Sequence, residues 1–200
     1  MAEADPSADV HRQLLDIYIQ ETPSYIDLTL PEVTDVTGEV HLGKLCNAIA
    51  DLPDVLDFRE RCIREAVDAG RKVLCISRGK SMLVKLAERF DNAALIVEET
   101  PQSDRTGLVK RSQVIFAISQ LGLEGLDDDS IDSAVVLTPL KDQLGLIQFF
   151  GRLQRPKTGK KTPTVVFMDD VRIPILHALI NKARKEMRNR GYTYRTLSVP

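Results

Sequence analysis

The sequence predicts an α/β fold: a three-layer domain in which a mostly parallel sheet is covered by helices on both faces. Short runs of consecutive apolar residues, such as 72–76 and 133–137, have the composition of strands buried on both faces. These runs alternate along the chain with segments whose apolar residues recur at helical spacing. Such alternation is typical of parallel strands joined by helical crossovers.

Length and composition fit one globular domain. The chain has 200 residues, of which 43% are hydrophobic and 28% charged, which is enough apolar mass for a core. The apolar run 93–97 is far too short to span a bilayer, and the acidic start is unlike a secretory signal, so a cytoplasmic or nucleoid-associated protein is expected. The three cysteines lack metal-type spacing and read as buried reduced thiols, and the three scattered histidines form no zinc pattern.

The first part of the chain contains fewer clear elements. Residues 1–24 are polar and are assigned to an N-terminal extension or linker, and residues 25–200 to the domain. Residues 24–30 alternate apolar and polar side chains and predict a strand that ends at Pro31. Helices are predicted at 42–49 and from Pro53 to Gly70.

The remaining chain follows a strict strand and helix alternation. Strands are predicted at 72–76, 95–97, 113–118, 133–137, 164–168 and 192–197. Ser77 is a plausible N-cap for the helix after the first of these, and a polar loop is expected from 98 to about 107. The last helix covers about 173–190 and is closed by Gly191.

In such folds ligands lie beyond the carboxyl ends of the strands. This rule places Ser77-Arg78-Gly79, Thr100 and the loop 119–127 along one edge of the sheet. The helix that follows Thr138-Pro139 starts from the same edge. The polar and glycine-rich positions are therefore predicted to gather at one edge.

That helix carries two arginines on one face. Gln148, Arg152 and Arg155 are spaced i, i+4 and i+7, so their side chains share a face. The opposite, apolar face consists of Leu146, Phe149, Phe150 and Leu153. Gly151 is costly inside a helix and suggests that something approaches the backbone closely. Paired arginines suit phosphate oxygens. A surface helix with solvated arginines explains residues 148–156 equally well.

Charge is distributed unevenly. Residues 141–200 contain 13 Lys and Arg against 4 Asp and Glu, a net charge of +9, whereas residues 1–140 carry −11. This asymmetry indicates either a surface for an anionic ligand or nucleic acid, or a solvated charged helix near the C-terminus.

With these segments in order, the chain resembles the second, C-terminal RecA-like domain of superfamily 2 helicases, in particular the helicase-like proteins of phages and their DEAD/DEAH-type relatives. Residues 72–78 resemble helicase motif IV, and residues 118–127, ending Gly-Leu-Asp, resemble motif V. Residues 148–155 resemble motif VI, the Gln-x-x-Gly-Arg-x-x-Arg box. The likeness covers roughly residues 25–200, and motifs V and VI together are its most specific part.

The resemblance implies a role for each matching position. Arg155 would be the arginine finger and Arg152 its companion at the γ-phosphate of ATP, and Gln148 would orient them. ATP with Mg²⁺ would be held mainly by a first RecA-like domain, present in cis or in trans, and Gly125 and Asp127 would lie beside the nucleotide. The positions implied at the nucleic-acid backbone are Ser77, Arg78, Ser119 and Gln120.

The sequence departs from the family pattern at two positions. Gln154 stands where the family often has glycine, which puts the local packing in question, and Ser119 replaces a threonine but keeps its hydroxyl. The 200 residues contain no Gly-x-x-x-x-Gly-Lys-Ser/Thr loop and no Asp-Glu-x-Asp/His box. Arg78-Gly79-Lys80-Ser81 only imitates a phosphate loop, because Leu74 lies where the loop should begin.

Two acidic clusters imitate metal sites. Asp169-Asp170 resembles a magnesium-binding strand end, but Asp170 as a cap or lead-in to the next helix is favoured. Asp128 and Asp129 lack the rest of a calcium loop and read as solvated loop residues.

The first functional hypothesis is half of an ATP-dependent nucleic-acid helicase or translocase, with DNA favoured over RNA and no activity as an ATPase alone. The alternative is a stand-alone, non-catalytic module that binds nucleic acid or protein. A third possibility is an unrelated α/β enzyme with a coincidental arginine helix.

Overall fold

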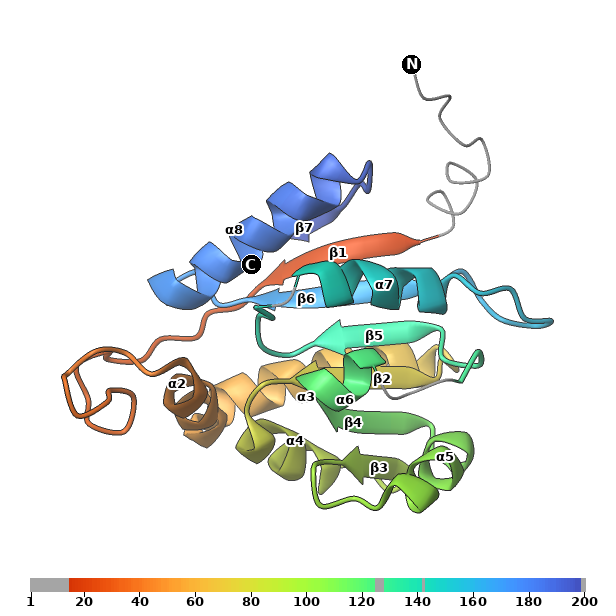
Figure 1. Ribbon diagram of the computed structural model, residues 1–200, viewed down its shortest axis with the longest axis horizontal. Coiled ribbons are helices and arrows are strands. Elements are labelled where there is room, and N and C mark those ends of the chain that lie inside the picture. The colour runs from red at the N-terminus through yellow and green to blue at the C-terminus, as the bar shows by residue number, and fades with distance from the viewer. Residues whose placement is uncertain (1–14, 125–127, 142, 199–200) are drawn as a thin grey trace.

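A seven-stranded sheet organises the chain in the computed structural model, which describes residues 15–124, 128–141 and 143–198 (Figure 1). The strands are β1 (Asp16–Glu21), β2 (Val73–Ser77), β3 (Ala93–Ile96), β4 (Val114–Ile118), β5 (Ser133–Val136), β6 (Thr164–Asp169) and β7 (Arg195–Leu197). Their order is β3-β4-β2-β5-β6-β1-β7, and every pair is parallel. The predicted fold class is confirmed.

Helices cover both faces of this sheet. They are α2 (Leu42–Ala48), α3 (Pro53–Asp68), α4 (Lys80–Ala87), α5 (Gln102–Arg111), α6 (Ser119–Glu124), α7 (Gln143–Leu153) and α8 (Pro174–Asn189), and a 3₁₀ turn, Ile49–Asp51, follows α2. One core lies beneath α2, α3 and α4, and the other beneath α6, α7 and most of α8. The strands serve both cores because successive side chains point to opposite faces: Cys75 belongs to the first core and Ile76 to the second.

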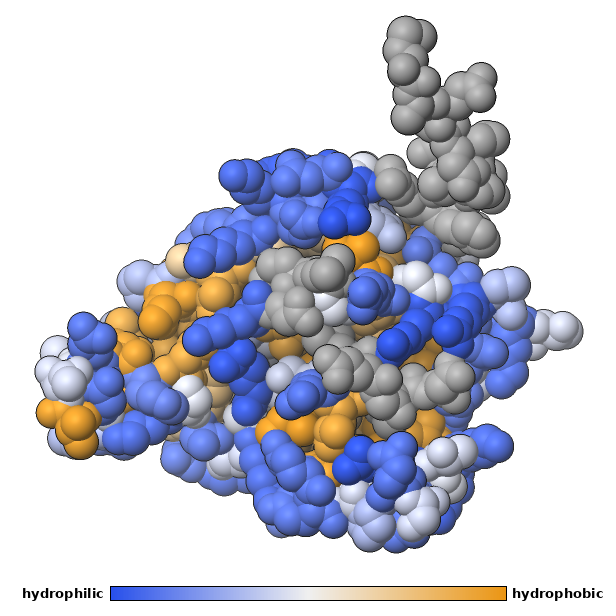
Figure 2. Space-filling model, viewed as in Figure 1, coloured by the Kyte–Doolittle hydropathy of each residue, from blue (hydrophilic) through white to orange (hydrophobic). Residues whose placement is uncertain are grey.

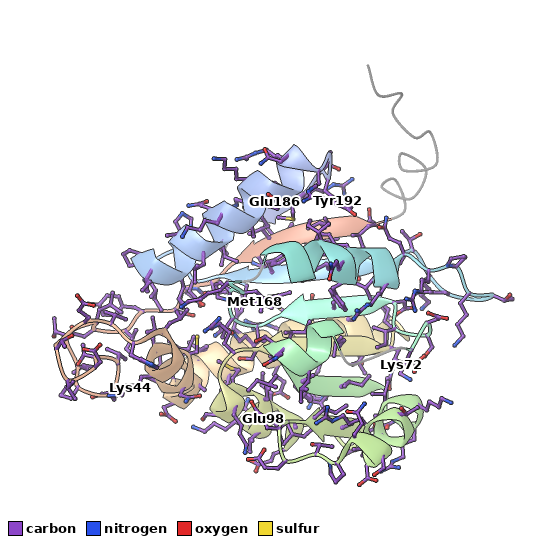
Figure 3. All side chains as sticks on the ribbon, in the orientation of Figure 1. Lys44, Lys72, Glu98, Met168, Glu186 and Tyr192 are labelled. Atoms are coloured by element: carbon purple, nitrogen blue, oxygen red, sulfur yellow. The ribbon has the colours of Figure 1, made fainter. Side chains whose placement is uncertain are left out.

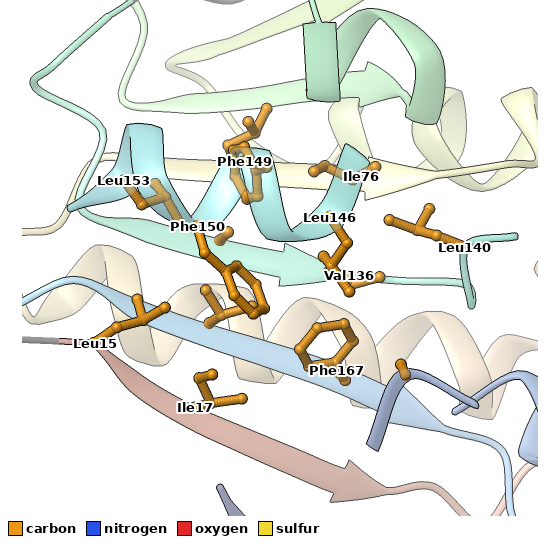
Figure 4. Close-up of a cluster of buried hydrophobic side chains, with 14 of the residues drawn as sticks. Leu15, Ile17, Ile76, Val136, Leu140, Leu146, Phe149, Phe150, Leu153 and Phe167 are labelled. Carbon is orange, nitrogen blue, oxygen red and sulfur yellow. The ribbon is translucent and has the colours of Figure 1, made fainter. Parts of the chain in front are cut away.

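The apolar face of α7 lies where its spacing predicts. Phe149 and Phe150 are 4% and 0% exposed and lie over the sheet with Leu146 and Leu153 (Figure 4). The Phe150 ring meets the Phe167 ring edge-on at 6.3 Å between centroids. This burial fixes the rotation of α7 about its axis, so the opposite, polar face must point outward.

The start of the sheet differs from the prediction. The strand predicted at 24–30 is wrong, since Asp27 accepts hydrogen bonds from the backbone and side chain of Thr29 in a local turn. Instead β1, within the range assigned to an extension, pairs with β6 on one side and β7 on the other. Ile17 and Ile19 point into the core beneath α7 and α8. Residues 1–14 lie outside the described part of the chain.

Two further local predictions are also wrong. The loop expected at 98–107 contains α5, whose polar sequence hides it because Val109 is its one fully buried residue. Ser77 does not cap α4. It ends β2, and Gly79 is the N-cap residue, which fits because a Cβ there would lie 2.9 Å from the carbonyl oxygen of Cys46. The closing glycine of α8 is as expected: Gly191 has φ +76°, and Tyr192 N–H donates to Met187 O.

A fully buried ion pair joins α3 to the end of β6. Arg59 on α3 contacts both carboxylate oxygens of Asp170, at 3.0 and 2.9 Å, and also donates to Leu137 O. The hydroxyl of Thr22, just after β1, donates to the same carboxylate at 2.6 Å. The expected role of Asp170 as a helix cap is therefore wrong: its carboxylate neutralises a buried arginine, and Ile173 is the N-cap residue of α8.

Candidate functional site

The candidate residues divide between opposite edges of the sheet: the strand ends and the start of α7 share the carboxyl edge, as predicted, whereas the arginines lie at the other edge. Helix α7 begins beyond the carboxyl end of β5 and runs back across the sheet, so its last turn lies near the amino ends of the strands (Figure 1). Arg155 pairs there with Asp129, and Lys157 approaches Asp128, both in the segment that leads into β5. The strand ends at Ser77 and Ile118 lie at the other edge. Figure 3 marks the amino edge by Lys72 on the right and the carboxyl side by Lys44 of α2 on the left.

At the amino edge, the two arginines lie side by side against an acidic segment. Arg155 Nη1 is 3.5 Å from Asp129 Oδ1, with both side chains about half exposed. Arg152 is half-buried, and together with Arg155, Asp128 and Asp129 it lines a small hollow whose floor includes Phe149. Pairs this exposed contribute little free energy, about 0–1 kcal/mol, so Arg155 can exchange its carboxylate for another anion at low cost.

Asp128 is not the solvated loop residue that the sequence suggested. Its side chain is only 11% exposed and pairs with Lys72 at 2.8 Å, while Ser130 donates both its backbone N–H and its hydroxyl to the carboxylate. Burial alone would raise the pKa of Asp128, but the hydrogen bonds from Lys72 and Ser130 outweigh it and lower the pKa to about 2. The carboxylate is therefore a fixed negative charge that anchors this segment beside α7.

The outer face of α7 carries the remaining motif residues. Gln148 and Gly151 are exposed, and no described atom outside the helix's own neighbourhood lies within 4 Å of a Cβ built on Gly151. The close approach inferred from this glycine is therefore not made by the described part of the chain. Gly125 and Asp127, expected beside the nucleotide, lie outside the described residues.

At the carboxyl edge, Ser77 and Arg78 are held by Thr138. Ser77 is fully buried: its hydroxyl accepts the Gly79 N–H at 3.0 Å and lies 3.3 Å from Thr138 Oγ1. The same Thr138 oxygen accepts the Arg78 N–H at 2.8 Å. These bonds fix the backbone at the end of β2, so of this pair only the partly exposed Arg78 presents its side chain to solvent.

Ser119 and Gln120 reach the same edge from the neighbouring strand. Ile118 is the register partner of Ser77, so Ser119 and Arg78 both follow directly at the same level of the sheet. Ser119 and Gln120 are the first two residues of α6; Ser119 is half-buried and Gln120 is exposed. The structure therefore brings Arg78, Ser119 and Gln120 to one edge and places the arginines of α7 at the other.

The acidic strand end of β6 is occupied by side-chain partners. Asp169 is fully buried and contacts His177 Nδ1 at 2.8 Å and Arg184 at 2.9 Å. Across the described ranges, no group of His, Cys, Asp and Glu side chains could hold a metal ion.

The three cysteines are free: Cys46 and Cys75 are buried and Cys62 is half-buried. Burial raises the pKa of the Cys46 thiol to about 11, which keeps it protonated. Among the helices that the structure describes, none is long and apolar enough to cross a membrane.

Comparison with solved structures identifies the class of fold. The chain superposes on T4 UvsW with a TM-score of 0.62 over 92% of its length and 42% of that protein, at 14% sequence identity. It matches the C-terminal part of the Fun30 ATPase domain with a TM-score of 0.55 over 74% of its length and 48% of that chain, at 15% identity. The chain thus spans less than half of each. No protein-family model and no curated protein matches the sequence.

These matches establish the fold: the chain has an α/β RecA-like fold. At 14% and 15% identity they carry no information on individual residues. The roles expected for Arg152, Arg155 and Gln148 therefore rest on sequence motifs and on geometry.

Proposed function

We propose that the chain is the second RecA-like domain of an ATP-dependent nucleic-acid helicase or translocase, acting on DNA, and that it completes an ATP site formed mainly by a first RecA-like domain. Arg155 acts as the arginine finger, Arg152 as its companion, and Gln148 orients them. ATP and its Mg²⁺ are held mainly by the first domain, with Gly125 and Asp127 beside the nucleotide. The chain alone does not hydrolyse ATP.

The observation that carries this proposal is the outward face of α7. Its apolar face is committed to the core, Gln148 and Gly151 are exposed on its outer face, and Arg155 is exposed just beyond its last residue, Leu153. Charge held against the γ-phosphate oxygens stabilises the transition state of phosphoryl transfer, and an arginine finger contributes about 10³–10⁵ in rate. A finger supplied by a second domain makes hydrolysis depend on domain closure.

The opposite edge supplies the contact with nucleic acid. Arg78, Ser119 and Gln120 follow two adjacent strands, and Ser77 fixes the backbone beneath Arg78. Hydroxyl, amide and guanidinium groups suit the sugar-phosphate backbone, which carries little sequence information. Because the two sites lie on opposite edges of one rigid sheet, a shift of the domain along DNA would move the finger relative to the nucleotide.

The test is ATPase activity of the chain alone and of the chain joined to a first RecA-like domain that carries a phosphate loop. Each is assayed without nucleic acid, with single-stranded DNA, with branched DNA and with RNA. We expect activity only in the joined protein, stimulated by DNA, and a fall in kcat of about 10³ or more in Arg155→Ala. Arg190→Ala is the control, since this exposed arginine directly follows α8 and pairs with Glu186. Hydrolysis by the chain alone would contradict the proposal.

A second candidate is a non-catalytic module that binds nucleic acid, favoured by the +9 charge of residues 141–200. It would bind DNA with an affinity that falls steeply with salt. Arg152→Ala and Arg155→Ala would then leave the ATPase activity of the joined protein unchanged.

A further inference from the structure

A cavity of about 260 Å³ lies where the chain leaves α7 and enters β6. Its lining includes Gln154, Arg155, Pro156, Lys157, Lys160 and Pro163, and no acidic side chain borders it within the described residues. Figure 1 shows this connection extending past the amino ends of the strands, on the right. Figure 2 shows hydrophilic residues over the same part of the surface. The cavity thus combines an apolar floor of proline rings and side-chain stems with a cationic rim.

Gln154 supplies a buried donor at this cavity. Its side chain is 8% exposed, and its Nε2 has no hydrogen-bond partner among the described residues. The other end of the amide is held, because Tyr192 Oη donates to Oε1 at 3.5 Å. Buried polar groups in proteins are almost always satisfied, so this donor in the wall of the cavity is available to a water molecule or to an acceptor atom of a ligand.

The two lysines of the rim have acidic neighbours but no carboxylate closer than 4.0 Å among the described residues. Lys160 is half-buried, and its Nζ donates to Arg155 O at 3.3 Å. Burial lowers the pKa of Lys160, and Lys157 acts in the same direction, whereas Asp129, Asp132 and Asp128 raise it by less than burial lowers it. Lys157 has one distant acidic neighbour, Asp128, at 4.0 Å. A phosphate between these two lysines would offset their repulsion and the desolvation of Lys160.

We propose that this cavity binds a mononucleotide. Its phosphate lies between Lys157 and Lys160, an acceptor atom of its base receives the Gln154 amide N–H, and the flat base lies on the rings of Pro156 and Pro163. An apolar wall with a few convergent polar groups is the usual form of a small-molecule site. The inference concerns this chain alone and does not depend on the proposed ATP hydrolysis.

Isothermal titration calorimetry of the 200-residue chain tests the proposal, with AMP, inorganic phosphate and a single-stranded oligonucleotide without a terminal phosphate as separate titrants. We expect AMP to bind more tightly than inorganic phosphate, and the oligonucleotide not to compete with AMP. Lys160→Ala should weaken AMP binding roughly 10-fold to 100-fold, because it removes a charge-assisted contact. Gln154→Met, which keeps the buried volume but removes the donor, should weaken AMP more than inorganic phosphate.

Lys185→Ala is the matched control, since Lys185 is exposed on α8, away from the cavity lining, and its loss should leave AMP affinity unchanged. If Lys160→Ala does not fold, Lys157→Ala provides the same measurement at the other side of the phosphate. Absence of AMP binding at millimolar concentration, or equal weakening in Lys160→Ala and Lys185→Ala, would overturn the proposal. So would an oligonucleotide that binds tightly and is lost in the same variants, because the rim would then belong to a nucleic-acid surface.

Discussion

In the proposed function, Arg152 and Arg155 are the residues that this domain contributes to the ATP site, and in the isolated chain Arg155 is held by an exposed ion pair. Arg155 contacts Asp129 at 3.5 Å across a half-exposed pair, which holds the guanidinium near the amino edge of β5 at little energetic cost. The incoming γ-phosphate offers a higher charge and a fork-shaped match to the guanidinium. In the proposed function, Asp129 therefore holds the finger in place until a nucleotide replaces it.

Asp128 provides a residue-scale prediction on stability. Its pKa is about 2 in the folded chain, below the ordinary value for aspartate, so the carboxylate stabilises the fold at pH values above about 4. This contribution is lost as the pH falls from about 4 toward 2. Asp128→Asn should lower the free energy of unfolding by roughly 1–2 kcal/mol at pH 7, and the difference from the unsubstituted chain should shrink at pH 3.

Urea unfolding at both pH values measures this difference. Asp104→Asn, an exposed acid near the start of α5, is the control and should change stability little. A difference that stays constant from pH 7 to pH 3 would mean that the Lys72 and Ser130 contacts do not depend on the charge of Asp128.

At the scale of elements, α7 is a helix with one face committed to the core and one face open. The four apolar residues of its inner face hold it against β5 and β6, so the exposed positions can be selected for function alone. Gly151 lies on the open face. A glycine inside a helix is less favourable than alanine by about 1 kcal/mol, and no described atom outside the helix lies within 4 Å of a Cβ built there. In the proposed function, the first RecA-like domain passes close to α7 at this glycine.

Two Gly→Ala substitutions compare the open and the packed surface. Gly151→Ala should stabilise the isolated chain by up to about 1 kcal/mol yet lower the ATPase rate of the joined protein, since the new methyl group would meet the first domain. Gly79→Ala should destabilise the chain by about 1–3 kcal/mol, because its Cβ would lie 2.9 Å from the Cys46 carbonyl oxygen and from Asn47 Oδ1. Thermal unfolding and ATPase rates measure both. If Gly151→Ala leaves the rate of the joined protein unaltered, the outer face of α7 is not a contact surface.

At the scale of the molecule, β1 joins the amino-terminal segment to the carboxyl-terminal part of the sheet. This strand lies between β6 and β7, and Thr22, directly after it, bonds to the buried Asp170 that neutralises Arg59. The amino-terminal segment, the end of β6 and α3 are therefore held at a single point. A sheet joined in this way moves as one body, which the proposed translocase function requires.

Ile19→Ala tests whether β1 is an integral strand. Ile19 is fully buried beneath α7 and α8, and its truncation should cost about 2–5 kcal/mol of unfolding free energy. Val36→Ala removes a side chain that is fully exposed in the loop before α2 and should change stability by less than about 0.5 kcal/mol. Urea unfolding compares the two variants. If both substitutions change the free energy of unfolding by equal, small amounts, residues 16–21 are not an integral strand of the sheet.

Local pattern was sufficient for much of this fold. The strands β2 to β6 and the helices α3, α7 and α8 carry strong periodicity or long apolar runs, and those features follow directly from burial on one or two faces. Spacing also predicts that Gln148 and Arg152 share the outer face of α7, but the helix ends at Leu153, so the extension of that face to Arg155 is wrong. The sequence does not predict helix α5 or strand β1. Helix α5 has only one buried residue and so lacks an apolar face, and β1 is a strand because β6 and β7 provide its backbone hydrogen-bond partners.

The sequence by itself determined the fold class, the core face of α7 and which side chains share its outer face, because these depend on residues near one another in the chain. The tertiary structure alone decided that the arginines and Arg78 occupy opposite edges of the sheet, that Asp170 neutralises Arg59, and that Gln154 lines a cationic cavity. Each of these depends on where distant segments end in space, and hydrophobic spacing along the chain does not encode such positions.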